Sequence, residues 1–433
     1  MDKTLEVFQQ PVYGEIIVPG DKSMSHRAVI FGALSKGKTH ITNLLTGEDC
    51  LRTVKAFQAL GVSIDVNDTS CEIDSQGPTS FKEPTEPIYF GNSGTTARLL
   101  IGLFSSIPGH YVVYGDYSLS KRPMDRVVSP LKQMGASING RSNGSKLPIA
   151  IEGKQLKGMT YELPVHSAQV KTAILLAGMF SDGTTTVIEP VPTRDHTERM
   201  LPAFGGKIDI KDNQISITNQ QSLMGTNVTI PGDISSAAFF IVASAIIPGS
   251  DITIRDVGLN PTRTGVIDIL LQMGADITVT PTRNIGKEPV GDIRVKGSPL
   301  KGTVIQGDII PRLIDEIPIL ALAASQAEGP TIIKDAKELR YKETDRIEAV
   351  ATTLRKLGVN VTTFDDGISI EGTSKLRGGE FETYSDHRIG MMVAIASLLT
   401  SEPVTLKEVE MIDISYPNFF EHLEQLKRKE KHK

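Results

Sequence analysis

Cationic side chains gather in short polar stretches that could bind a ligand carrying more than one negative charge. The stretch 340–346 (RYKETDR) holds three cations and two carboxylates, and Arg122 follows Lys121 in a predicted loop. Arg388 precedes a long apolar run, where a partly buried arginine needs an anionic partner. Several arginines facing one ligand bind phosphate or carboxylate oxygens through paired hydrogen bonds. These residues predict a site for a small, multiply charged anion.

Two further polar stretches stand where predicted helices begin. The stretch 20–27 (GDKSMSHR) places Lys22 and Arg27 there, and 91–98 (GNSGTTAR) places Gly94 there. Unpaired N–H groups at a helix N-terminus bind anions, and glycine lets a ligand approach the backbone. Ser or Thr at a helix start is more often only a cap, so each stretch alone is weak evidence. Neither stretch fits the P-loop or dinucleotide fingerprint.

Asp315 stands immediately before another apolar run and has two open interpretations. It could be a helix N-cap, with Pro318 in the first turn. It could also be a general base, because the helix dipole would keep its carboxylate ionised at neutral pH. The sequence alone does not choose between the two.

Composition excludes several classes of protein. The chain has 433 residues, 39% of them hydrophobic and 22% charged, which predicts a globular protein of two domains. The net charge of −5 argues against nucleic acid as a partner.

Cys50 and Cys71 show no zinc or disulfide spacing and are predicted to be buried thiols, and no His or Cys pair predicts a metal. The N-terminus has no apolar signal core, and no apolar run reaches the ~20 residues of a membrane span, so we expect a cytoplasmic protein.

One pattern recurs at intervals of about 72 residues, which predicts six structural units. In each unit a polar motif precedes a run that is apolar on nearly every side, typical of a buried helix. In five units a second helix is predicted to end at a glycine that is followed by a β-like run. Glycine after the last helical turn is the usual left-handed helix stop. The apolar runs are 28–34, 97–104, 173–180, 237–245, 317–324 and 389–399. The glycines are Gly61, Gly135, Gly205, Gly274 and Gly358.

These elements predict an α/β fold of two similar domains, each with three copies of a βαβαββ unit around buried parallel helices. The sixth surface helix, predicted over 419–429, has no strand after it, and 5–18 is expected to supply that strand. The matching stretches VPGDKS and IPGDIS place the domain crossings near Gly20 and Gly232. The first domain then comprises 1–20 and 233–433, and the second comprises 21–232.

With these motifs assembled, the chain resembles the 5-enolpyruvylshikimate 3-phosphate synthase family along nearly its whole length. The motifs that carry the resemblance are 20–27, 91–98, 121–124 (KRPM), 167–171 (SAQVK), 313–318 (LIDEIP), 340–346 and 385–388 (SDHR). Those similar to the second class of the family are 167–171, 194–198 (RDHTE) and 260–263 (NPTR). The resemblance implies a monomeric enzyme of aromatic amino acid and chorismate biosynthesis, a target of glyphosate, with its active site in the interdomain cleft and no cofactor.

The resemblance also implies two small-molecule substrates, shikimate 3-phosphate and phosphoenolpyruvate, and assigns residues to each. The residues implied for shikimate 3-phosphate are Lys22, Ser23, Arg27, Ser167, Ala168, Gln169, Arg194, Asp315 and Lys342. Those implied for phosphoenolpyruvate are Lys22, Gly94, Arg122, Gln169, Arg346 and Arg388. Asp315 would take the proton of the attacking 5-hydroxyl, and Glu343 with Lys22 would manage the proton at the methylene carbon. Addition would give a tetrahedral intermediate, which loses phosphate.

The chain departs from the family pattern at one position, and a second bears on inhibitor tolerance. Part of the family carries a lysine near the C-terminus before an aromatic-Pro pair, where this chain has Ser415. Some glyphosate-insensitive members carry Ala where this chain has Gly94. The second-class motifs and Gly94 therefore point in different directions on inhibitor tolerance.

Two alternative functions remain open at this point. A sister transferase with a UDP-sugar acceptor shares the six-unit fold, but it typically carries a cysteine on a loop near 121–124. This chain has no cysteine after Cys71, which weighs against that alternative. A non-catalytic anion-binding protein could also use the scaffold, because fold does not imply function. The presence of Asp315 and Glu343 beside the cations disfavours it, since binding alone needs no base.

Overall fold

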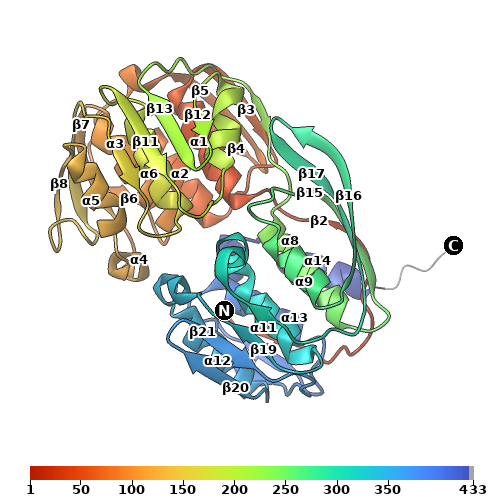
Figure 1. Ribbon diagram of the computed structural model, residues 1–433. Helices are drawn as coiled ribbons and strands as arrows, with labels where there is room; N and C mark the ends of the chain where they lie inside the picture. Colours follow the sequence, from red (N-terminus) through yellow and green to blue (C-terminus); the bar gives the residue numbers. More distant parts are fainter. Residues whose placement is uncertain (429–433) are drawn as a thin grey trace. The chain divides into compact units, whose positions relative to one another are not determined.

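The computed structural model describes residues 1–428 and divides into two compact units (Figure 1). Unit 1 consists of Met1–Pro19, Pro231–Asn284 and the chain from Pro289 on, whereas unit 2 consists of Gly20–Ile230 and Ile285–Glu288. The sequence predicts crossings near Gly20 and Gly232, and it gives no signal for the short segment Ile285–Glu288 of unit 2. None of the helices described within 1–428 is long and apolar enough to cross a lipid bilayer.

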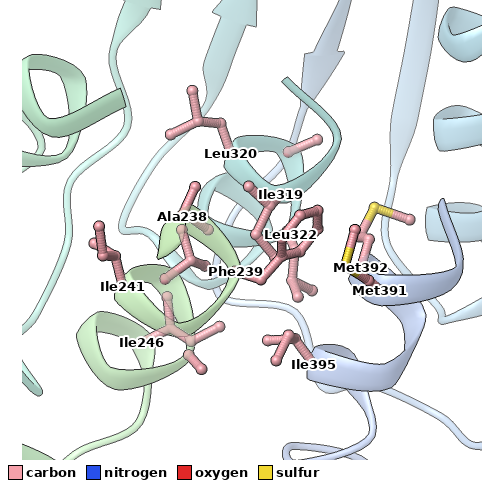
Figure 2. Close-up of a cluster of buried hydrophobic side chains, with 14 of the residues drawn as sticks. Ala238, Phe239, Ile241, Ile246, Ile319, Leu320, Leu322, Met391, Met392 and Ile395 are labelled. Atoms are coloured by element: carbon pink, nitrogen blue, oxygen red, sulfur yellow. The ribbon is translucent and has the colours of Figure 1, made fainter. Parts of the chain in front are cut away.

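Three buried helices form the centre of each unit, and all six apolar runs become helices as predicted. Those of unit 2 are α1 (Lys22–Leu34), α3 (Gly94–Ser106) and α6 (Ala168–Gly178). Those of unit 1 are α8 (Ile234–Ile246), α11 (Ile317–Gln326) and α13 (His387–Ala396). Figure 2 shows Phe239, Leu322 and Ile395, one from each helix of unit 1, in one cluster of buried apolar side chains. Cys50 and Cys71 are buried thiols, also as predicted.

The three sheets of unit 2 share one topology, in which an outer strand runs parallel to its neighbour and the remaining pairs are antiparallel. The strand orders are β14-β3-β5-β4, β6-β7-β9-β8 and β10-β11-β13-β12. In the sheet β14-β3-β5-β4 the strands span Asn227–Thr229, Lys36–Thr42, Ser70–Gln76 and Ser63–Asn67. In the sheet β6-β7-β9-β8 they span Ile88–Tyr89, Gly109–Tyr114, Ile149–Gly153 and Ser137–Gly140. In the sheet β10-β11-β13-β12 they span Thr160–Glu162, Thr184–Ile188, Gln214–Thr218 and Asp209–Lys211.

Unit 1 repeats this arrangement, with one sheet of three strands. The strand orders are β16-β17-β15-β2, β18-β19-β21-β20 and β1-β23-β22. In the sheet β16-β17-β15-β2 the strands span Asp276–Ile285, Glu288–Lys296, Asp251–Gly258 and Tyr13–Ile17. In the sheet β18-β19-β21-β20 they span Val304–Ile305, Thr331–Ile333, Gly367–Ile370 and Val361–Phe364. In the sheet β1-β23-β22 they span Lys3–Leu5, Val404–Leu406 and Gly379–Phe381.

Two outer strands are exchanged between repeats at the chain crossings. Strand β2 precedes α1 in the sequence but pairs in parallel with β15, with Tyr13 opposite Asp251. Strand β14 precedes α8 but pairs in parallel with β3, with Asn227 opposite His40. Each crossing is therefore a strand of one unit followed by a buried helix of the other. This shared role explains why VPGDKS and IPGDIS resemble each other.

The segment predicted to close the repeat was 5–18, but the strand that closes it is β1, which overlaps that segment only at Leu5. Strand β1 pairs antiparallel with β23, whereas β2 joins the sheet of β15. Pro11 lies between the two strands and has no N–H to donate to a strand ladder, which favours a break there. The last helix, α14, is described over Phe419–Lys427, and residue 429 of the predicted helix lies outside the described residues.

Left-handed glycines end the helices that cover the sheets, as predicted. The φ angles of Gly61, Gly135, Gly205, Gly274 and Gly358 lie between 81° and 98°. The covering helices are α2 (Glu48–Ala59), α5 (Asp125–Gln133), α7 (His196–Met200) with a following 3-10 turn, α9 (Gly265–Gln272) and α12 (Arg346–Lys356).

Gly102 lets two buried helices of unit 2 pack at very short range. A Cβ atom at this position would lie 2.3 Å from the carbonyl oxygen of Ala173 on α6, so any larger residue would push α3 and α6 apart. The close approach fixes the polar N-termini of the two helices relative to each other.

Candidate active site

The N-terminus of α1 carries a capping aspartate and a lysine that forms an ion pair with α2. The Asp21 carboxylate caps the helix by accepting from the backbone N–H of Met24 at 2.8 Å. The Lys22 ammonium forms an ion pair with Asp49 of α2 and keeps about a fifth of its side chain exposed. The sequence predicted Lys22 as a ligand but gave no role to Asp49, which lies far away in the chain.

Arg27 is buried and joins three helices of unit 2. Its guanidinium donates to the Ser23 carbonyl at 2.9 Å, to Thr172 Oγ1 of α6 at 2.9 Å and to Thr197 Oγ1 of α7 at 2.7 Å. Thr172 and Thr197 share a further hydrogen bond of 2.8 Å. These acceptors are uncharged, so the contacts orient the guanidinium without neutralising it. Ser23 and Arg27, both predicted ligands, are thus brought together.

Gly94 lies against two arginines at the start of α3. A Cβ at this position would lie 2.8 Å from Nη1 of Arg98 and 3.0 Å from Nη1 of Arg122. Gln169 of α6 accepts from Arg98 Nη1 at 2.8 Å and donates to Thr95 Oγ1 at 2.9 Å. The structure therefore groups the predicted residues Gly94, Arg122 and Gln169, and the guanidinium groups occupy the space that glycine leaves.

The start of α6 and the loop before α7 carry the remaining predicted residues of unit 2. Ser167 is the N-cap of α6, with its hydroxyl 3.4 Å from the backbone nitrogen of Val170, and Ala168 is the first helical residue. Arg194 is half-buried in the loop that leads into α7. A serine in this position serves the helix whether or not it also binds a ligand.

Three carboxylates surround Arg346 in unit 1. Its guanidinium donates to Asp386 Oδ2 at 2.7 Å, to Asp315 Oδ1 at 3.1 Å and to Glu343 Oε2 at 2.6 Å. The residue is only 1% exposed. Although burial opposes its charge, the three carboxylates raise the pKa of Arg346 above its usual value, so it stays a cation.

Asp315 is not a helix cap, so that interpretation of the sequence was wrong. It lies in the 3-10 turn Ile314–Glu316 before α11, and α11 has no side-chain cap at its start. Its Oδ1 instead accepts from Lys342 Nζ at 3.0 Å as well as from Arg346. The predicted Pro318 does stand in the first turn of α11. The carboxylate of Asp315 therefore points to two cations.

Arg388 completes the group in unit 1. Its Nη1 donates to the Asp315 carbonyl oxygen at 3.0 Å and lies 3.6 Å from Glu316 Oε1. The same oxygen of Glu316 accepts from the Ser235 hydroxyl, which also accepts from Arg263 at 2.6 Å. Arg388 is thus held beside Asp315 by a network that begins at α8.

Sequence reasoning missed Arg98 and Glu316. Arg98 lies one helical turn after Gly94 in the stretch 91–98, and this spacing places the two residues on one face of α3. Glu316 directly follows Asp315, and its contact with Arg388 spans more than 70 residues of sequence. The contact of Arg98 with Gly94 therefore had a local signal in the sequence, whereas the contact of Glu316 with Arg388 had none. Within residues 1–428, no group of three or more His, Cys, Asp or Glu side chains could hold a metal ion.

These clusters of cations beside carboxylates, set on a sixfold repeat, correspond to a known family. A family model described as EPSP synthase (3-phosphoshikimate 1-carboxyvinyltransferase) matches residues 8–423. The chain belongs to this family. The match covers both units and includes all six buried helices.

Individual EPSP synthases resemble the chain over their full length. The 3-phosphoshikimate 1-carboxyvinyltransferase of Oceanobacillus iheyensis is 53% identical over 422 residues, which are 98% of each chain. The enzyme of the same name from Bacillus subtilis is 51% identical over 421 residues, covering 97% of this chain and 98% of that protein. A solved structure of EPSP synthase from Acinetobacter baumannii superposes with a TM-score of 0.87 at 47% identity, covering 98% of both chains.

Proposed function

We infer that the chain is a 3-phosphoshikimate 1-carboxyvinyltransferase, which moves the enolpyruvyl group of phosphoenolpyruvate to the 5-hydroxyl of shikimate 3-phosphate and releases phosphate. The observation that carries this inference beyond family membership is the placement of Asp315. A carboxylate that contacts both Lys342 and Arg346 combines a proton acceptor with cations that attract anionic substrates. A protein that only binds anions gains nothing from a carboxylate there, because it weakens the positive charge.

Residues of both units are proposed to hold shikimate 3-phosphate. Lysine and arginine suit its phosphate group, and serine hydroxyls and a backbone N–H suit its remaining oxygens. The proposed ligands are Lys22, Ser23, Arg27, Ser167, Ala168, Gln169, Arg194, Asp315 and Lys342. Ser23 and Arg27 are already in contact in unit 2, and Asp315 and Lys342 are in contact in unit 1.

Phosphoenolpyruvate is proposed to bind to a second set of cations. The proposed ligands are Lys22, Gly94, Arg122, Gln169, Arg346 and Arg388. Arg346 is bound by three carboxylates, so the loss of one of them would offer this substrate more of its five N–H donors. Glu343 is the most exposed of the three, with 19% of its side chain accessible, and it is therefore the partner that we expect to leave.

Proton transfers link these groups to the reaction. Asp315 takes the proton of the 5-hydroxyl, which becomes the nucleophile. Glu343, with Lys22, supplies the proton to the methylene carbon of the enolpyruvyl group and takes it back when the double bond reforms. The arginines neutralise the charge that develops on the tetrahedral intermediate and on the departing phosphate. The release of Glu343 from Arg346 thus serves substrate binding and proton transfer together.

Product analysis tests the proposed reaction. The protein is incubated with phosphoenolpyruvate and shikimate 3-phosphate, and the mixture is analysed by mass spectrometry. We expect one product whose mass equals the sum of the two substrates minus phosphoric acid. Unchanged phosphoenolpyruvate would favour a binding protein, and a product formed only with UDP-N-acetylglucosamine would move the acceptor to a sugar nucleotide. The cytoplasmic location and the monomeric state stay predictions.

A further inference from the structure

Lys171 is completely buried between two carboxylates in unit 2. It belongs to α6, none of its side chain is exposed, and its Nζ lies 2.9 Å from Glu189 Oε2 and 2.5 Å from Glu198 Oε1. Both carboxylates are themselves buried. Charged groups are removed from water at high cost unless they are paired, so this cluster indicates a specific structural role. None of its three members belongs to the proposed ligand set.

The two carboxylates mark the two ends of a single segment, 189–198. Glu189 directly follows β11, and Glu198 lies in the first turn of α7. One ammonium group therefore holds both ends of the segment against α6. Burial raises the pKa of Glu198, while the charge of Lys171 opposes this shift.

Two threonines fasten the interior of the same segment. Thr193 donates from its hydroxyl to Glu189 Oε1 at 2.5 Å. Thr197 accepts from Arg27 and shares a hydrogen bond with Thr172, the residue after Lys171 on α6. Arg194 follows Thr193 directly, so its backbone is held between these fixed points. Four side-chain anchors in ten residues leave little freedom for the main chain that carries Arg194.

We propose that the Lys171–Glu189–Glu198 cluster is a positioning device that fixes the segment 189–198 on α6 and thereby sets the affinity for the phosphorylated acceptor. It acts through Arg194 on the segment and through Ser167 at the start of α6. The inference rests on the proposed function, because that function assigns Arg194 and Ser167 to shikimate 3-phosphate. Lys171, Glu189 and Glu198 are positioning residues and touch neither substrate.

Direct binding of shikimate 3-phosphate tests the positioning role without requiring turnover. Glu198→Gln removes one charge and leaves Lys171 paired with Glu189. We expect calorimetry to show an acceptor Kd about tenfold higher than that of the unchanged protein, because a misplaced charged hydrogen bond loses at least this much. The Michaelis constant for phosphoenolpyruvate should stay within about twofold, since its proposed ligands lie outside the segment.

Two further variants separate positioning from loss of stability. Glu189→Gln releases the other end of the segment and should raise the acceptor Kd in the same way, so the test stands if one variant does not fold. Ile174→Val removes one methylene from the buried part of α6 and touches no charge. It should lower the melting temperature but leave the acceptor Kd unchanged. An equal rise in Kd in Ile174→Val would overturn the proposal, as would an unchanged Kd in either glutamate variant that folds.

A double variant tests whether the cluster acts through Arg194. Arg194→Ala should raise the acceptor Kd, and adding Glu198→Gln should raise it little further, because residues that act as one unit are not additive. Additive effects, or an unchanged Kd in Arg194→Ala, would refute the route through Arg194.

Failure of the proposed function has a different signature: shikimate 3-phosphate would bind, but no phosphate would be released. Absence of acceptor binding by the unchanged protein would overturn both.

Discussion

Arg346 donates a hydrogen bond of 3.1 Å from Nη1 to Oδ1 of Asp315. Lys342 donates to the same oxygen, so two cations stabilise the negative charge of this carboxylate. In the proposed reaction Arg346 binds phosphoenolpyruvate and Asp315 takes the proton of the acceptor hydroxyl. The hydrogen bond thus couples the binding of one substrate to the deprotonation of the other.

Asp315→Asn tests the role of the base. The amide keeps the shape and can still accept from Lys342 and Arg346, but it cannot take a proton from the hydroxyl. We expect kcat to fall by about 10²–10⁴, the usual share of a general base. Steady-state kinetics measure this change, with Asp308→Asn, an exposed aspartate seven residues earlier, as the control. Near-normal turnover in Asp315→Asn would remove Asp315 from this role.

Arg388→Ala tests the assignment of phosphoenolpyruvate. Arg388 is held beside Asp315 by the Asp315 carbonyl and faces Glu316. Removing the guanidinium should raise the Michaelis constant for phosphoenolpyruvate by about 10- to 100-fold, as expected for a hydrogen bond to a charged group. The Michaelis constant for shikimate 3-phosphate should change far less. Arg294→Ala, at an exposed arginine paired with Asp251, is the control. Equal changes for the two substrates would show that the assignment is wrong.

Gly94→Ala tests the contact between α3 and the two arginines. The added methyl group would lie within 3.0 Å of a guanidinium nitrogen of both Arg98 and Arg122. Because both guanidinium groups stand at the ends of flexible side chains, they can move, and the melting temperature should change little. Their displacement should raise the Michaelis constant for phosphoenolpyruvate about tenfold. An unchanged constant would mean that Arg122 does not contact this substrate.

His26 predicts a loss of stability in mild acid. Its ring is buried, its Nδ1 lies 2.7 Å from Thr53 Oγ1, and burial lowers its pKa well below 6.5, with the charges of Lys22 and Arg27 adding to the effect. The unfolded chain therefore binds a proton near pH 6.5 that the folded chain does not. Stability from this residue is present above that pH and is lost as the pH falls below it, by up to about 1.4 kcal/mol per pH unit.

Denaturant unfolding at several pH values checks the role of His26. His26→Asn removes the titrating ring and keeps a polar group near Thr53. The free energy of unfolding of the variant should depend less on pH than that of the unchanged protein in the range from about pH 7 to about pH 5. Identical slopes in the two proteins would contradict the prediction.

Local signals explain why so much of the fold could be predicted. An apolar run marks each buried helix in the sequence, and a position just after a helix marks each left-handed glycine, such as Gly61. Because both signals are local in the sequence, the six units could be predicted. The matching stretches VPGDKS and IPGDIS mark the two chain crossings, but they do not show which sheet β2 and β14 join. Pro11 marks the break between β1 and β2, but its meaning is clear only when the sheet that each strand joins is known.

The candidate site was predictable in its residue types but not in its pairings. The stretch 340–346 predicted a cationic cluster, yet nothing in it shows that Arg346 lies between Asp315, Glu343 and Asp386. These pairings join segments up to 40 residues apart and depend on how α11, α12 and α13 pack. For the same reason the sequence left Asp315 open between cap and base, although its true partners are two side chains of the stretch 340–346.

Release of inorganic phosphate tests the central claim most directly. The protein is mixed with phosphoenolpyruvate and shikimate 3-phosphate, and phosphate is followed over time, with reactions lacking either substrate and a parallel reaction containing UDP-N-acetylglucosamine. We predict stoichiometric release that requires both substrates, no release with the sugar nucleotide, and strong suppression in Asp315→Asn. No release from the folded protein with shikimate 3-phosphate, or release only with the sugar nucleotide, would contradict the account.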